Sequence, residues 1–115
     1  MTLLLVALGA ALGAPTRYVV AHLFDGRLLG GCLHVGTILV NVAGSFLLGL
    51  FSGLALTGST IAFLGTGFCG ALTTYSAFAV QSHAQGWRLG AINVALTVVP
   101  ALALCWLGFW LGARA

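Results

Sequence analysis

Long apolar runs, separated by short polar stretches, organise the whole chain. A helix that crosses a bilayer needs about 20 mainly apolar residues, and the sequence offers four such runs. We expect transmembrane helices at about residues 3–23, 33–56, 61–82 and 89–111, forming a single four-helix transmembrane domain over residues 1–115. The connectors are short and rich in turn residues, so consecutive helices are predicted to be antiparallel neighbours.

Polar residues recur within these runs at helical spacing, which places them on one face of each helix. A single stripe of this kind is typical of helix packing, because Asn, Ser and Thr bond across membrane helices. Several stripes in so short a chain indicate either the polar wall of a path or the seam of a tight bundle. The stripes are Thr37, Asn41 and Ser45; Tyr75, Phe78 and Ser82; and Asn93 and Thr97.

The third run contains the segment GFCGALTTYSAF, residues 67–78, which is poorly suited to a continuous helix. Glycine weakens a helix, and the hydroxyls of Thr73 and Thr74 compete for backbone hydrogen bonds. We therefore expect a broken third helix, with the break between Gly70 and Thr74. Carbonyls freed at membrane depth must be satisfied by protein, water or an ion, and carbonyl oxygens suit a hard cation.

Glycine pairs spaced four residues apart occur in three of the runs. Glycine at this spacing lets two helix backbones approach closely in lipid. We interpret these pairs as packing surfaces between helices. They are Gly9 and Gly13, Gly49 and Gly53, and Gly108 and Gly112.

The composition identifies an all-α integral membrane protein. The chain is 61% hydrophobic and 4% charged, whereas a soluble domain carries about 25% charged residues. Four arginines stand against one acid, with no basic run, which excludes a nucleic-acid partner. The sequence has no Ser/His/Asp arrangement, carboxylate pair or phosphate loop, so we do not expect an enzyme.

The polar groups inside the runs favour an anion over a cation or a proton. The single acid, Asp25, lies in a connector, so no run holds a carboxylate for a cation or a proton relay. Hydroxyl and amide groups donate hydrogen bonds, and aromatic ring edges are positive. Arg17 either draws anions into a vestibule or extends to the lipid headgroups.

The arginines also bear on orientation in the membrane. Arg17, Arg27 and Arg88 belong to one side and Arg114 to the other. The positive-inside rule then predicts cytoplasmic first and third connectors. The bias is small, and insertion in both orientations stays open.

Three segments resemble the Fluc (CrcB) family of fluoride channels. They are GAALGAPTRY (9–18), GTILVNVAGSFLLG (36–49) and GFCGALTTYSAF (67–78), and the resemblance extends over essentially the whole chain. It implies an antiparallel, dual-topology dimer with two fluoride pores along the subunit interface. It also implies a multi-pass protein of the bacterial cell membrane that exports fluoride passively and so lowers its cytoplasmic concentration.

The resemblance further implies roles for individual residues. Backbone carbonyls of Gly70 and Thr73 would hold a structural sodium ion that is not transported. Arg17 would lie in the vestibule. The fluoride pore would contain Asn41, Tyr75, Phe78, Ser76 and Thr97.

Two positions depart from the family pattern, because Tyr75 stands where phenylalanine is expected and Asn93 where tyrosine is frequent. These departures leave two pairings open, of which we favour a homodimer over a heterodimer with a paralogous chain. Two other functions compete with the channel. A small four-helix multidrug exporter would need a membrane-buried carboxylate, which Asp25 does not supply, and a non-conducting assembly subunit would use the polar stripes only for packing.

Overall fold

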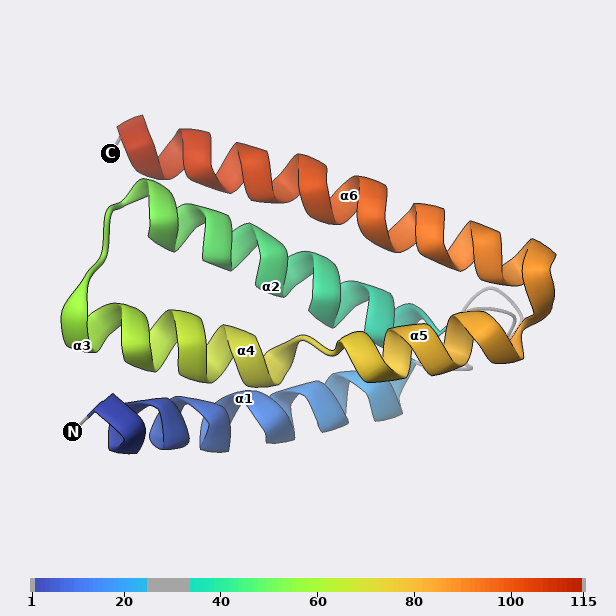
Figure 1. Cartoon of the computed structure of the whole chain (residues 1–115), viewed down its shortest axis with the longest axis horizontal. Coiled ribbons are helices and arrows are strands. Elements are labelled where there is room, and N and C mark those ends of the chain that lie inside the picture. The colour runs from blue at the N-terminus through green and yellow to red at the C-terminus, as the bar shows by residue number, and fades with distance from the viewer. Residues whose placement is uncertain (1, 25–33, 115) are drawn as a thin grey trace.

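Four long apolar helical segments run side by side along the molecule (Figure 1). The computed structural model describes residues 2–24 and 34–114. Within these residues the spans are α1 (Thr2–Phe24), α2 (Val35–Gly53), an interrupted third span from Gly58 to Ala84, and α6 (Gly86–Arg114). All four are long and apolar enough to cross a membrane. The first connector, with Asp25 and Arg27, lies outside the described residues.

The third and fourth spans extend further into the connectors than predicted, whereas α2 is shorter than predicted and ends at Gly53. The predicted second connector begins at Thr57, but α3 (Gly58–Ile61) already starts one residue later. Only Gln85 separates α5 (Tyr75–Ala84) from α6. Gly86, with φ of 85°, supplies the left-handed conformation that this sharp reversal requires. The two termini consequently lie at the same end of the molecule (Figure 1).

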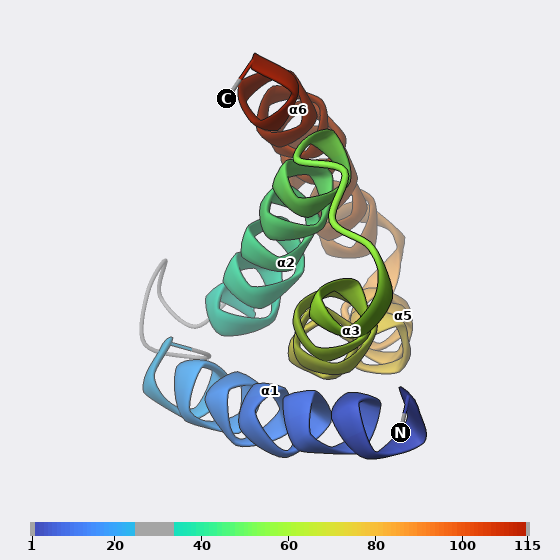
Figure 2. The same ribbon diagram turned by 90° about the vertical axis from the view of Figure 1, so that its left-hand side faces the viewer.

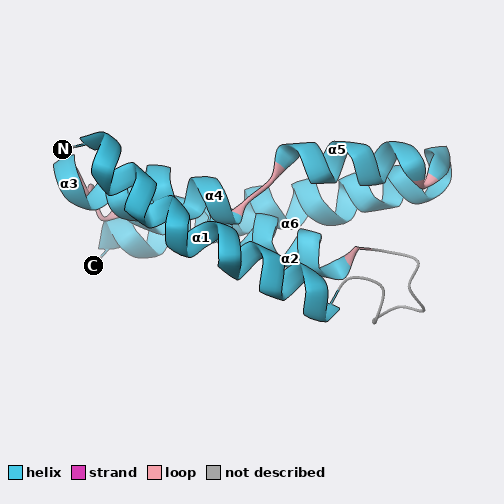
Figure 3. Ribbon diagram, turned by 90° about the horizontal axis from the view of Figure 1, so that it is seen from below, coloured by secondary structure: helices cyan, strands magenta, loops and turns pink. Residues whose placement is uncertain are grey.

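The third span is broken, as predicted. After α3 come a π-helical segment, η2 (Ala62–Cys69), and one short α-helical turn, α4 (Gly70–Leu72). Thr73 and Thr74 are extended, with φ/ψ of −82°/160° and −149°/121°. The helix resumes as α5, so the break is the short loop between α4 and α5 in Figure 3.

The closest packing joins helices that are not consecutive in the sequence. α2 lies mainly against α6, and α1 mainly against η2 (Figure 2). A Cβ on Gly9 would overlap the backbone of Phe63, and one on Gly108 would overlap the backbone of Phe46. The interpretation of the glycine pairs as packing surfaces is confirmed. Helices that are consecutive in the sequence are also in contact, although less extensively than these two pairs.

Polar contacts connect the two helix pairs. Asn41 of α2 bonds to the break in the third span, and Asn93 of α6 bonds to Ser82 of α5. The outer surfaces of α1 and α6 expose many large apolar side chains, Leu3, Val99 and Trp106 among them. Such surfaces suit contact with lipid, and the buried polar residues therefore gather between the helices, around the break.

Candidate functional site

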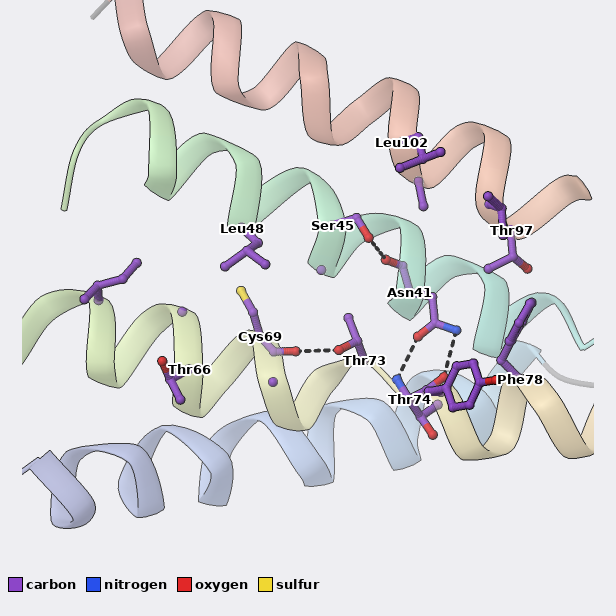
Figure 4. Close-up of a pocket in the computed structure, with 17 residues that line it drawn as sticks. Asn41, Ser45, Leu48, Thr66, Cys69, Thr73, Thr74, Phe78, Thr97 and Leu102 are labelled. Carbon is purple, nitrogen blue, oxygen red and sulfur yellow. Dashed lines mark hydrogen bonds between the residues drawn. The ribbon is translucent and has the colours of Figure 1, made fainter. Parts of the chain in front are cut away.

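A cavity of about 650 Å³ lies beside the break, between α2, the third span and α6 (Figure 4). Its wall contains most of the residues singled out in the sequence. These are Asn41, Gly70, Thr73, Tyr75, Phe78 and Thr97, together with Ser45 from the first polar stripe. The polar stripes of three spans thus meet at one cavity.

Asn41 makes two hydrogen bonds to the backbone of one residue in the break. Its Oδ1 accepts from Thr74 N at 2.7 Å, and its Nδ2 donates to Thr74 O at 3.1 Å (Figure 4). Ser45 Oγ donates to the main-chain oxygen of Asn41 at 2.8 Å. The side chain is 9% exposed, so these bonds satisfy polar groups that have little access to solvent.

Short-range hydrogen bonds hold the two extended residues. Thr73 donates to Cys69 O from both its backbone N, at 3.0 Å, and its Oγ1, at 2.9 Å. Thr74 Oγ1 accepts from Ala77 N at 3.2 Å and so caps the N-terminus of α5. Gly44 leaves the space that the methyl group of Thr73 occupies. The two threonines therefore stabilise both ends of the break.

Two aromatic rings follow directly after the break. Tyr75 and Phe78 have ring centroids 6.1 Å apart and planes tilted by 44°. Both line the cavity, and Tyr75 is 79% exposed. The hydroxyl of Tyr75 is thus carried on a ring that the single chain leaves uncovered.

α6 contributes two nearly inaccessible polar side chains. Asn93 is 1% exposed and donates from Nδ2 to Ser82 Oγ at 2.7 Å. Thr97 is 6% exposed and lines the cavity. Within the described residues, Asn93 Oδ1 and Thr97 Oγ1 make no hydrogen bond.

Arg17 and Ser76 lie at a second cavity, of about 300 Å³, and not at the first. Ser76 Oγ is 3.3 Å from Thr74 Oγ1, and Gln81 also lines this space. Thr74 is the residue that lines both cavities. No described residue is acidic, so no carboxylate there neutralises Arg17.

The backbone at the break fits a cation bound by carbonyl oxygens. In an uninterrupted α-helix the N–H of Thr74 would bond to the oxygen of Gly70, but here it bonds to Asn41 Oδ1. Gly70 is exposed, and the backbone of Thr73 is extended. Across residues 2–24 and 34–114 no group of three His, Cys, Asp or Glu side chains could hold a metal, so backbone oxygens are the donors that fit.

Three residues around the site were not among the sequence candidates. Thr74 was identified only as weakening the helix, although it lines both cavities. Gly44 follows Asn41 by three residues, a spacing that places it on the same face of α2. Gln81 could have been found as an amide side chain within an apolar run.

Comparison with known proteins gives consistent results over nearly the whole chain. Residues 4–109 match the family described as "CrcB-like protein, Camphor Resistance (CrcB)". A Rhodococcus jostii protein named "Fluoride-specific ion channel FluC 2" is 50% identical over 113 residues, covering 95% of this chain and 96% of the relative. A Thermococcus onnurineus "Fluoride-specific ion channel FluC" is 36% identical, covering 95% and 94%. A Nocardia farcinica "Fluoride-specific ion channel FluC 1" is 40% identical, covering 92% and 80%.

Proposed function

This chain belongs to the CrcB family, and from that premise we propose that it is a fluoride-selective channel of passive conduction. Its matched relatives are named as ion channels, a class that is not enzymatic. The alternatives of a multidrug exporter and an assembly subunit have no support among these relatives. The chain is a multi-pass membrane protein with four spans among its described residues.

The observation that carries the proposal is a mostly apolar cavity whose wall includes hydroxyl, amide and aromatic side chains, with no carboxylate in the described residues. Fluoride is small and strongly hydrated, so a selective path must replace its water. Moving an unpaired ion into a low-dielectric medium costs roughly 20 kcal/mol in the idealised case. Hydroxyl, amide and ring-edge groups would offset part of this cost. Halides larger than fluoride would fit a narrow path less well.

We assign the fluoride path to both cavities. Arg17 forms a vestibule that attracts the anion, with Ser76 beside it. Beyond Thr74 the path continues along a wall that contains Asn41, Tyr75, Phe78 and Thr97. The joint position of Thr74 in the two cavities supports this order.

A second copy in antiparallel orientation would complete the path. Tyr75 is 79% exposed in the single chain, and a polar aromatic ring at that depth is better covered by protein than by lipid. Most soluble homo-oligomers are closed, and two-fold dimers are the commonest. We favour a homodimer, with a paralogous partner chain as the alternative, placed in the bacterial cell membrane to export fluoride that enters as HF.

The break is the proposed site of a structural sodium ion. Carbonyl oxygens of Gly70 and Thr73 would hold it, and bound sodium would supply positive charge that keeps these oxygens together. The proposal is supported by the diverted N–H of Thr74, which leaves the Gly70 oxygen without its α-helical donor. Sodium is not transported in this scheme.

Purified protein in liposomes loaded with fluoride tests the function, with an electrode that reports fluoride efflux. We expect rapid efflux once an ionophore removes the opposing membrane potential, and no comparable efflux of chloride. Liposomes without protein provide the baseline. Absence of efflux, or equal efflux of chloride, would refute the channel.

A further inference from the structure

The two hydrogen bonds between Asn41 and Thr74 assign Asn41 a role different from that of a fluoride ligand. We propose that Asn41 is a positioning residue that keeps the break open and the Gly70 carbonyl available to a cation. This inference rests on the proposed channel and on its cation site. It concerns how the chain builds that site.

The Asn41 side chain pairs with the backbone of Thr74 through both of its polar groups. A side-chain amide has one acceptor and one donor group side by side, as a peptide in a neighbouring strand would have. Asn41 uses both, because Oδ1 accepts at 2.7 Å and Nδ2 donates at 3.1 Å to the same residue. The extended backbone of Thr74, with φ/ψ of −149°/121°, is the conformation in which its N–H and C=O can both be reached from one side.

The bond to Oδ1 also prevents the N–H of Thr74 from bonding elsewhere. Without an acceptor at position 41, the N–H of Thr74 would lack a partner at membrane depth, where such a group costs several kcal/mol. Its nearest alternative is the carbonyl of Gly70, one helical turn earlier. Forming that bond would continue α4 (Gly70–Leu72) through the break and occupy the oxygen that the cation needs.

The surface of α2 next to Asn41 also fits the break. Ser45 Oγ donates to the main-chain oxygen of Asn41 at 2.8 Å, a bond within α2 that reaches neither the Asn41 amide nor Thr74. Gly44, on the same face of α2, admits the methyl group of Thr73. The α2 surface thus fits the break at two adjacent points, and truncating the amide removes the polar one.

The amide nitrogen carries a second N–H, so direct donation to fluoride is the competing role for Asn41. The two roles predict different effects of sodium concentration on an Asn41 variant. Loss of a positioning partner weakens cation binding, typically by about 10–100-fold, whereas loss of a fluoride ligand lowers flux at every sodium concentration.

The test compares Asn41→Leu with wild type by two measurements in sodium or N-methylglucamine salts. The first is thermal unfolding in detergent, which needs no transport: a cation that binds only the folded protein raises Tm with its concentration. We expect sodium to stabilise the wild type, and Asn41→Leu to need about 10–100-fold more sodium for the same half-maximal effect. The second is fluoride efflux, which should recover in the variant as sodium is raised, with halide selectivity unchanged.

Ser45→Ala is the matched control, because it removes a hydroxyl from the same stripe but no bond to Thr74. Its sodium dependence should follow the wild type. Asn41→Ser, whose hydroxyl is too short to bridge both groups of Thr74, replaces Asn41→Leu if the latter does not fold. The inference is overturned if sodium raises the Tm of both Asn41 variants at the same concentrations as it does for the wild type. It is also overturned if sodium does not raise the Tm of the wild type. Absence of wild-type efflux overturns the channel, while the thermal measurement still decides the role of Asn41.

Discussion

Asn93 of α6 and Ser82 of α5 are joined by a hydrogen bond of 2.7 Å from Nδ2 to Oγ. Gly90 lies beside the same contact, because a Cβ there would overlap the main-chain oxygen of Ser82. The half-helix that follows the break is thus held against α6 by one polar bond and one close backbone approach. The aromatic pair on α5 depends on this attachment for its position.

Ser82→Ala should destabilise the protein, because it leaves the amide of Asn93 buried without its acceptor. An unsatisfied buried group costs about 1–3 kcal/mol. Reversible unfolding of the single variants and of Ser82→Ala/Asn93→Leu provides a double-mutant cycle. The double variant should lose less stability than the two single changes together, and strict additivity would show that the bond contributes nothing.

Gly108→Leu should separate α2 from α6, because even a Cβ at this position overlaps the backbone of Phe46. Overpacking of this kind costs about 1–3 kcal/mol or more. Ala103→Leu provides the control, since Ala103 is exposed on the same helix. Thermal stability in detergent should fall for the first variant only. Equal stability of both variants would show that the close approach is not required.

Thr74→Ala should weaken the start of α5. The change removes the acceptor for Ala77 N, and loss of an N-cap side chain costs about 1 kcal/mol. Thr74→Ser keeps an acceptor at the same place and should retain most of the stability. A stability ranking with Ser below Ala would contradict the capping role.

Phe78→Ile should reduce fluoride efflux by about tenfold or more, which corresponds to about 1.4 kcal/mol of lost stabilisation. The change keeps an apolar side chain but removes the positive ring edge. Tyr75→Phe keeps the ring and should retain efflux within about twofold, a difference of under 0.5 kcal/mol on the same scale. If Phe78→Ile conducts like the wild type, the aromatic assignment is wrong even where the channel stands.

Arg17→Gln should slow fluoride entry most at low ionic strength. A charge at a vestibule raises the local anion concentration, and salt screens this effect over about 10 Å at 0.1 M. Efflux rates of variant and wild type should therefore converge as an inert salt is added. A deficit that does not depend on salt would point to a structural role for Arg17.

The sequence allowed the spans and the break to be predicted because both depend on local chemistry. The length of each apolar run determines where a span can lie. The hydroxyls of Thr73 and Thr74 compete with the helix for backbone hydrogen bonds. The partner of Thr74 was not predictable in this way. Asn41 is distant in sequence, and its stripe fitted a pore wall as well as a contact with the backbone.

The division between the two cavities also lay beyond the sequence pattern. Helical periodicity predicts which residues share a face only while the helix is regular. The π-helical turns of η2 and the two extended residues change the rotation of α5 relative to the first half of the span. Periodicity within α5 separates Ser76 from the face of Tyr75 and Phe78, but it does not show which cavity each face meets. Ser76 lies with Arg17, while Tyr75 and Phe78 line the larger cavity.

The pairing of α2 with α6 has a consequence for biosynthesis. The glycine-lined face of α2 is covered by α6, which is synthesised only after the whole third span. At synthesis rates of about 5–20 residues per second, that face waits several seconds for its partner. During this interval the face is open to lipid, to the insertion machinery or to another nascent chain, and the arrival of α6 closes it.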